Sequence, residues 1–144
     1  METYSIILQT LALLGVVIAL VTYIYSKKTS KAKFVHELNL EYNSNKKYLE
    51  IFNKIEWEGE IDLKDERFKY EAEGFFAFFE YIVYLRFNKI LHDNDFNIYR
   101  YMLIRVLTCN DIKVYLKQLE DFSSERKINF PYLNLKRYSE LYLK

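Results

Sequence analysis

The sequence predicts an all-α protein in which an N-terminal transmembrane helix is followed by a small cytosolic helical bundle. The 144 residues include only three glycines and one proline, so tight turns are scarce. Residues 4–26 carry no charge, and elsewhere apolar residues recur at intervals of three and four, the period of an amphipathic helix. We therefore divide the chain into a transmembrane signal-anchor helix (1–26), a stretch of basic juxtamembrane and amphipathic helices (27–55) and a cytosolic helical domain (56–144).

The apolar N-terminal stretch has the length of a membrane span. At about 1.5 Å per residue, a helix over residues 4–26 reaches about 34 Å, against about 30 Å for the hydrocarbon core of a bilayer. Four lysines follow within residues 27–33, so the positive-inside rule predicts an inner-membrane protein with its N-terminus outside and its C-terminal domain in the cytoplasm. A cleaved signal peptide is the alternative, but Glu2 stands where a signal peptide needs basic residues.

One side of this predicted span carries small and hydrogen-bonding residues, namely Gln9, Ala12, Gly15 and Ala19. Gly15 and Ala19 form a small-xxx-small pair, which lets two membrane helices approach closely. The Gln9 amide needs a hydrogen-bonding partner in hydrocarbon. We therefore expect a homo-oligomer held by these helices, the alternative being a chance pattern, since Gly and Ala are common in spans.

The next part of the chain combines amphipathic helices with an acidic loop. Residues 29–54 have the apolar period of one or two helices, and Asn43, Ser44 and Asn45 predict a break between them. Residues 56–73 are rich in acids and contain Gly59, which predicts a solvated polar loop that leads into a helix.

The aromatic run over residues 74–85 is predicted to be a core helix. It is interrupted by Glu80 and, at about half the length of a bilayer span, is too short for a second crossing. We consider two environments for Glu80: solvent, or a structural ion pair with Arg100 or Arg105 on the following helix, because a buried charge must be matched.

A second apolar helix is predicted over residues 96–107, packed against the first as an antiparallel hairpin. Its opening N–H groups are expected to be capped by one of three polar residues, Asp93, Asn94 or Asp95. Asp111 is expected to cap a further helix that ends at Phe122. A polar loop over residues 123–129 then leads to a short final helix with Pro131 in its first turn.

Composition excludes several functions. Lys and Arg total 21 against 20 for Asp and Glu, so the chain has no strong positive electrostatic field that would favour DNA binding. The single cysteine, Cys109, is expected to act as a small buried hydrophobe, and His36 and His92 lie too far apart in sequence to suggest a metal site. Since no nucleophile–base pair or phosphate-binding glycine loop is visible, we expect no catalytic, cofactor or metal site and no enzyme activity.

Basic residues provide the candidate ligand or partner site. Arg86 shares a helical stripe with Phe75, Phe79 and Ile82, and the C-terminal third has a surplus of bases. The candidates are Arg86, Arg100, Arg105, Lys113, Lys117, Lys136 and Arg137. The alternatives for each are a solvated surface charge or, for the C-terminal bases, contact with anionic lipid.

Three stretches carry a family resemblance: the aromatic-aromatic-Glu step in residues 78–82, the acidic residues 93–95 and the aromatic C-terminal residues 138–142. In this order, after a single span and a basic turn, they resemble a poorly characterised bacterial and phage family of small single-span membrane-anchored helical proteins, a domain of unknown function. The chain departs from that pattern in its last helix, where the family usually has a tryptophan, because the only one here is Trp57. The resemblance brings no catalytic residues.

Two functions follow as hypotheses. The first is a non-enzymatic membrane-tethered helical module that oligomerises and scaffolds a partner or perturbs the membrane. Small proteins of this layout occur in phage-defence and prophage loci, so the resemblance implies a role in antiviral defence or prophage biology. The second is a membrane-associated sensor-effector, similar to ancillary effectors of CRISPR signalling, whose cytosolic domain binds a cyclic oligonucleotide through clustered bases and stacking tyrosines. The expected partners are therefore the lipid bilayer, further copies of the chain, and a protein or a cyclic oligonucleotide.

Overall fold

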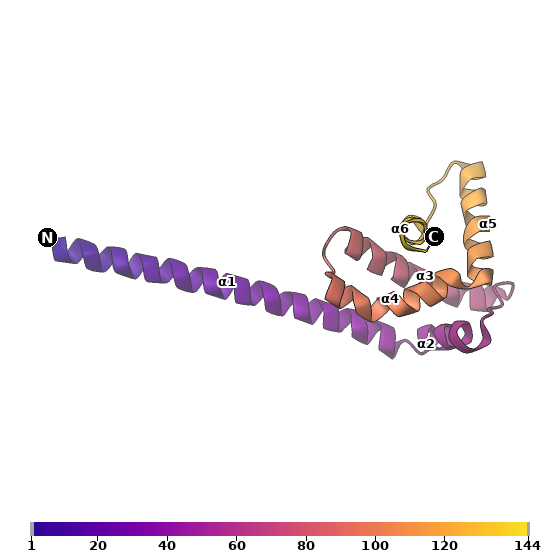
Figure 1. Cartoon of the computed structure of the whole chain (residues 1–144), viewed down its shortest axis with the longest axis horizontal. Coiled ribbons are helices and arrows are strands. Elements are labelled where there is room, and N and C mark those ends of the chain that lie inside the picture. Colours follow the sequence, from indigo (N-terminus) through magenta and orange to yellow (C-terminus); the bar gives the residue numbers. More distant parts are fainter. Residues whose placement is uncertain (1, 144) are drawn as a thin grey trace. The chain divides into compact units, whose positions relative to one another are not determined.

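The regular secondary structure in the part that the structure describes consists of helices, which confirms the predicted all-α class (Figure 1). The computed structural model describes residues 2–143, with the side chains of Tyr4 and of residues 11–143. In this range the chain forms six α-helices and one short π-helix and no strand: α1 (Glu2–Ser44), α2 (Lys46–Asn53), η1 (Lys54–Glu58), α3 (Glu66–Phe87), α4 (Asp93–Thr108), α5 (Asn110–Arg126) and α6 (Leu133–Tyr142). The chain divides into two compact units, Met1–Glu41 and Tyr42–Lys144.

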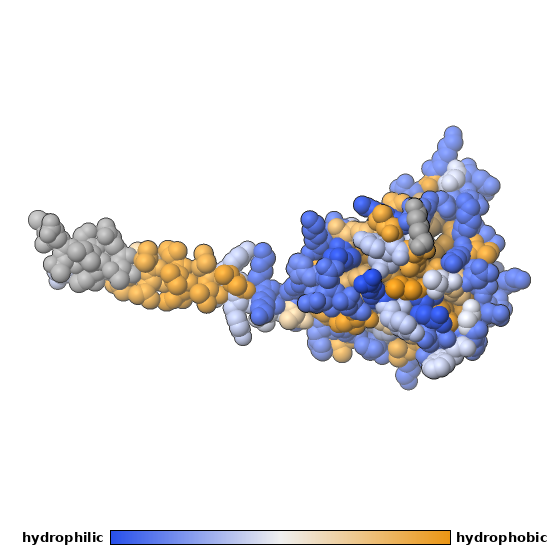
Figure 2. All heavy atoms as spheres, in the orientation of Figure 1, coloured by the Kyte–Doolittle hydropathy of each residue, from blue (hydrophilic) through white to orange (hydrophobic). Residues whose placement is uncertain are grey.

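In the first unit, α1 exposes the apolar side chains that the sequence assigned to a membrane span. Large apolar residues from Leu11 to Ile24 are each more than half exposed. On the face drawn in Figure 2, a continuous hydrophobic band covers part of α1 and gives way to a hydrophilic stretch farther along the helix. Helix α1 is long and apolar enough to cross a membrane. Of the predicted association stripe, Ala12, Gly15 and Ala19 are exposed, whereas Gln9 lies outside the described side chains.

The predicted break between the amphipathic helices is confirmed. Helix α1 ends at Ser44, and the Asn45 side chain starts α2 by accepting the backbone N–H groups of Lys47 at 3.1 Å and Tyr48 at 3.4 Å. The π-helix η1 continues directly from α2 and is capped at its C-terminus by Gly59, whose φ of 72° is the left-handed conformation that glycine adopts without strain.

The aromatic run forms the central helix of the second unit. Asp65 caps α3 by accepting the N–H groups of Arg67 and Phe68. Eight α3 side chains are buried, namely Ala72, Phe75, Phe76, Phe78, Phe79, Ile82, Val83 and Leu85. They pack mainly against α2, α4 and α6. The run is therefore a core helix, as its length and its interruption by Glu80 predicted.

Aromatic rings make up much of this core. The Phe75 and Phe79 rings lie edge to face with centroids 5.0 Å apart, and Phe78 meets Tyr99 of α4 at 5.9 Å. The Tyr42 ring also packs on this core, with its centroid 5.6 Å from that of Phe78. Its buried hydroxyl has no hydrogen-bond partner within the described part of the chain, and burial raises the pKa of Tyr42 to about 12.

Two predicted helix starts differ from the structure. Asp93 and Asp95 lie inside the first turn of α4, with His92 at the N-cap and no capping side chain. Carboxylates in a first turn still favour the helix, because they face the positive end of its dipole. Asp111 likewise lies in the first turn of α5, after Cys109 at the N-cap, and its carboxylate binds the Ile61 N–H instead.

The C-terminal elements also have different bounds from those predicted. Helix α5 continues past Phe122 to Arg126, through residues that the sequence assigned to a loop. The Ser124 hydroxyl donates to the Glu120 carbonyl at 2.9 Å, so this serine is satisfied inside the helix. Pro131 precedes α6, which begins at Leu133, rather than lying in its first turn.

Candidate functional site

Two of the predicted basic residues meet in a small pocket between α3, α4 and α6. This Arg86–Arg100 pocket has a volume of about 90 Å³ and is lined by Arg86, Asp93, Phe96, Asn97, Arg100, Tyr138 and Tyr142. Arg86 lies in the last turn of α3, and Arg100 lies in α4. Helices α3 and α4 contact each other and run in opposite directions, as the predicted hairpin requires (Figure 1), and α6 contributes Tyr138 and Tyr142.

The two guanidinium groups have different surroundings. Arg86 pairs with Asp93, and its guanidinium lies 5.9 Å from the centroid of the Phe96 ring. The Asp93 side chain is 78% exposed, so this ion pair is open to water and to competing anions. Arg100 lies beside the Tyr138 hydroxyl: burial raises the pKa of Tyr138, and the nearby Arg100 charge partly opposes that rise.

Aromatic rings form one wall of the pocket. The Tyr138 and Tyr142 ring centroids lie 4.7 Å apart, and Phe96 meets Tyr138 at 5.7 Å. Tyr142 is 57% exposed, so it presents a ring to solvent. Two guanidinium groups against one carboxylate, beside an exposed ring, can bind an anion and stack a flat group next to it.

Two other predicted arginines lie away from this pocket. Arg137 covers the Phe87 ring, with its guanidinium 4.6 Å from the ring centroid. Arg105 pairs with Glu56 of η1 at 2.7 Å, and Glu56 also accepts the Tyr101 hydroxyl. These two hydrogen bonds, first from Tyr101 and then from Arg105, hold the pKa of Glu56 below its usual range. Arg105 therefore fixes η1 to α4.

The three predicted lysines line a separate space, the α5–α6 cavity, of about 200 Å³. Its full lining is Leu107, Lys113, Leu116, Lys117, Glu120, Phe130, Leu135, Lys136, Ser139 and Glu140. Lys136 pairs with Glu120, and Lys117 approaches Asp121 at 2.8 Å and Glu120 at 3.6 Å. The hydrogen bond from Lys136 is the main reason that the pKa of Glu120 is lowered.

Glu80 has a different partner from the arginine that the sequence suggested. One carboxylate oxygen accepts the backbone N–H and side-chain amide of Asn134 at 2.9 Å and 2.7 Å, and the other accepts the Leu135 N–H at 2.8 Å. The half-buried charge is thus matched by the N-terminus of α6, whose unpaired N–H groups and dipole favour an anion. An ion pair with Arg100 or Arg105 is the wrong prediction, because the chain brings α6 rather than α4 to this face of α3.

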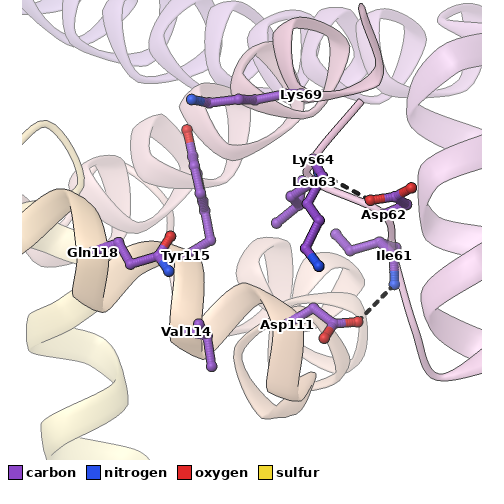
Figure 3. A pocket seen from close by; sticks show the side chains of 9 residues that line it. All are labelled: Ile61, Asp62, Leu63, Lys64, Lys69, Asp111, Val114, Tyr115 and Gln118. Atoms are coloured by element: carbon purple, nitrogen blue, oxygen red, sulfur yellow. Dashed lines mark hydrogen bonds between the residues drawn. The ribbon is translucent and has the colours of Figure 1, made fainter. Parts of the chain in front are cut away.

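Sequence reasoning missed a further pocket of about 520 Å³ between the acidic loop and α5 (Figure 3). In this view Lys64 and Lys69 come from the loop and from α3, and Tyr115 and Gln118 come from α5. The Asp111 carboxylate accepts the Ile61 N–H at 2.9 Å and so holds the loop on α5. No local sequence signal pairs residues 50 positions apart, which is why the pocket was not predicted.

The described side chains, those of Tyr4 and residues 11–143, include neither a metal-binding cluster nor an exposed thiol. The described side chains form no group of three or more His, Cys, Asp or Glu residues that could hold a metal ion. Cys109 is buried, and its thiol donates to the Gly59 carbonyl at 3.6 Å. It thus helps to attach the loop after η1 to the start of α5.

Comparisons with protein-family models, with curated proteins and with solved structures found no match to this chain. The candidate sites therefore stand on their own geometry.

Proposed function

We propose that the chain is a single-pass membrane protein, without enzyme activity, that holds a helical bundle at the cytoplasmic face of the inner membrane and scaffolds a partner there. The observation that carries this proposal is the apolar surface of α1. Leu11, Leu13 and Val16 are each more than 60% exposed, and an apolar surface of this length is stable only when lipid or protein covers it. The four lysines that follow support the cytoplasmic placement of the bundle.

Cysteine labelling tests anchoring and orientation together. In a Cys109→Ala background, we would place one cysteine at Thr3, before the span, and another at Glu60, in the exposed loop before α3. A membrane-impermeant maleimide added to intact cells should label Thr3→Cys, and should label Glu60→Cys only after the inner membrane is opened. The reverse pattern would overturn the orientation, and recovery of the protein in the soluble fraction would overturn the anchor.

Self-association through α1 is the second part of the proposal. The exposed Gly15 and Ala19 support it, since small residues let helix backbones approach within the bilayer. Oligomers would present several bundles side by side, which suits a scaffold. The resemblance to small membrane-anchored proteins of bacteria and phages suggests phage defence or prophage biology as the setting.

A second candidate function, a sensor for an anionic ligand such as a cyclic oligonucleotide, is favoured by the Arg86–Arg100 pocket. The pocket combines two guanidinium groups with the exposed Tyr142 ring, and these are the groups that bind phosphate and stack a base. With a volume of about 90 Å³, it has room for one phosphate rather than a whole nucleotide. A larger ligand would therefore extend over Tyr142 or onto a second copy of the chain.

Thermal melting separates the two functions. The full chain in detergent would be melted with and without cyclic di- and oligonucleotides, because a ligand that binds only the folded state raises the melting temperature. A sensor should show a shift that disappears in the Arg86→Gln, Arg100→Gln double variant and persists in Arg126→Gln, a control at an exposed arginine of α5. Absence of any shift in the melting temperature of the wild-type chain would exclude the sensor function and leave the scaffold as the remaining candidate.

A further inference from the structure

The α5–α6 cavity is built from two helical stripes that face each other. Lys113, Leu116, Lys117 and Glu120 follow one another at intervals of three, one and three along α5, and so lie on one face of that helix. The α6 side consists of Leu135, Lys136, Ser139 and Glu140. Leu107 at the end of α4 and Phe130 in the preceding loop complete the lining. The two helices are thus separated by a cavity of about 200 Å³.

The base of the cavity is apolar. Leu135 is fully buried, Leu107 is 3% exposed, and Leu116 and Phe130 are half-buried. A volume of about 200 Å³ corresponds to about seven groups of the size of a water molecule, at about 30 Å³ each. Cavities lined by Leu and Phe bind apolar molecules rather than water, because water there finds no hydrogen-bond partners. The base therefore suits a short hydrocarbon chain.

The rim of the cavity is cationic. Lys117 and Lys136 are paired with acidic residues of α5, and the Lys136–Glu120 ion pair bridges the two helices. Lys113 makes no ion pair among the described side chains, those of Tyr4 and residues 11–143, so its ammonium group remains available beside the apolar base. Three lysines against two glutamates give the lining a net positive charge. Charge complementarity therefore calls for an anionic group at Lys113.

We propose that the α5–α6 cavity binds a single-chain fatty acid, with its hydrocarbon chain against Leu116 and Leu135 and its carboxylate at Lys113. At about 30 Å³ per carbon group, about seven carbons of one chain fill the cavity volume, so a ten-carbon chain such as decanoate fills the cavity and extends past its mouth, whereas a lipid with two chains does not fit. The carboxylate accepts hydrogen bonds from the Lys113 ammonium group, and the Lys117 charge adds a weaker attraction. The site is separate from the Arg86–Arg100 pocket and does not depend on whether α1 crosses a membrane.

The test is a titration of the full chain in lipid nanodiscs with decanoate, followed by methyl NMR of leucine-labelled protein. Empty nanodiscs correct for partitioning of decanoate into lipid. Binding should move the Leu116 and Leu135 methyl signals in a saturable way, while leucines of the α1 span respond only to partitioning. No saturable shift, or shifts confined to other leucines, would overturn the proposal and leave the cavity to an apolar side chain of a partner.

Three variants separate the two halves of the site. Lys113→Gln should weaken decanoate binding about tenfold, because it removes a charge-assisted hydrogen bond. Lys46→Gln, at an exposed lysine of α2 without an ion pair in the described structure, should bind as the wild type does. Ser139→Leu should reduce binding by filling the cavity. Equal affinities for decanoate and decanol would refute the role of Lys113, and unchanged binding by Ser139→Leu would refute the cavity.

Discussion

Glu80, in the middle of α3, caps the N-terminus of α6 by accepting the Leu135 N–H at 2.8 Å. The same carboxylate accepts the backbone and side-chain N–H groups of Asn134. No side chain at the start of α6 itself performs this capping, since Tyr132 at the N-cap makes no side-chain hydrogen bond to the helix. A ten-residue helix is marginal on its own, so α6 depends on contacts of this kind with α3.

Removing this carboxylate should destabilise the bundle. Glu80→Ala leaves two partly buried backbone N–H groups without an acceptor, and we expect a loss of about 2 kcal/mol in the free energy of unfolding. For a unit of about 100 residues this lowers the melting temperature by about 10 °C. Near-ultraviolet circular dichroism of the full chain in detergent, which reports the tyrosine-rich core, measures the change.

The matched control is Glu125→Ala, which removes an exposed carboxylate of α5 that makes no ion pair within the described residues. Glu80→Gln should lie between the two, because its amide oxygen accepts one N–H but carries no charge. Equal melting temperatures for Glu80→Ala and Glu125→Ala would show that the α3 carboxylate does not hold α6.

The attachment of η1 to α4 should depend on pH. Hydrogen bonds from Tyr101 and Arg105 lower the pKa of Glu56 from its ordinary value of 4.5 in the folded chain. A carboxyl group whose pKa is lower folded than unfolded stabilises the fold above the unfolded value and loses that contribution as the pH falls through the folded value. We therefore expect wild type to exceed Glu56→Gln in stability by a constant margin from pH 6 to 8.

Below pH 4.5 that margin should shrink, because wild-type Glu56 becomes protonated and then carries no more charge than the Gln side chain of the variant. Urea unfolding of the wild type and of Glu56→Gln at several pH values measures the difference in their free energies of unfolding. Glu120 also has a lowered pKa, but it is present in both proteins and its contribution cancels in the difference. A margin that stays constant down to pH 3 would contradict the role of Glu56.

Features that depend on local sequence were predictable. The apolar period of α3 and its bounding charges marked a core helix, and the Asn43–Asn45 cluster marked the start of α2, since an Asn side chain caps the helix that follows it. The candidate span in α1 was also predictable, because its length and its lack of charge are properties of one continuous stretch of sequence.

Features that depend on which helices meet were not predictable. Arg86 and Arg100 were both candidates for a ligand site. They line one pocket with Tyr138 only because α3 and α4 fold into a hairpin and α6 packs beside them. Glu80 was recognised as a carboxylate that needs a partner, yet its partner is a backbone helix end, which has no sequence signature of its own. The loop pocket needed the contact between Ile61 and Asp111.

Tyr42 and Tyr115 should respond oppositely to loss of the hydroxyl group. The Tyr42 hydroxyl is buried without a partner in the described structure, so Tyr42→Phe removes an unsatisfied polar group and should raise the free energy of unfolding by up to about 1 kcal/mol. The Tyr115 hydroxyl donates to Glu73 at 2.8 Å, so Tyr115→Phe should lower it by about 1 kcal/mol. Urea unfolding compares both with wild type, and a destabilised Tyr42→Phe would show that its hydroxyl has a partner.

Gly15 offers the sharpest test of helix association in the membrane. A Cβ atom added at Gly15 meets nothing within 4 Å in its own chain, so a larger side chain there is tolerated by the monomer. Any effect of Gly15→Ile must then come from a second helix, whose approach a small residue permits and a branched one blocks. We expect Gly15→Ile to weaken association about tenfold, measured by energy transfer between donor- and acceptor-labelled chains in liposomes. Val17→Ile, on the opposite side of the span, should leave the transfer unchanged, and equal transfer in Gly15→Ile would place the contact elsewhere on α1 or in the bundle.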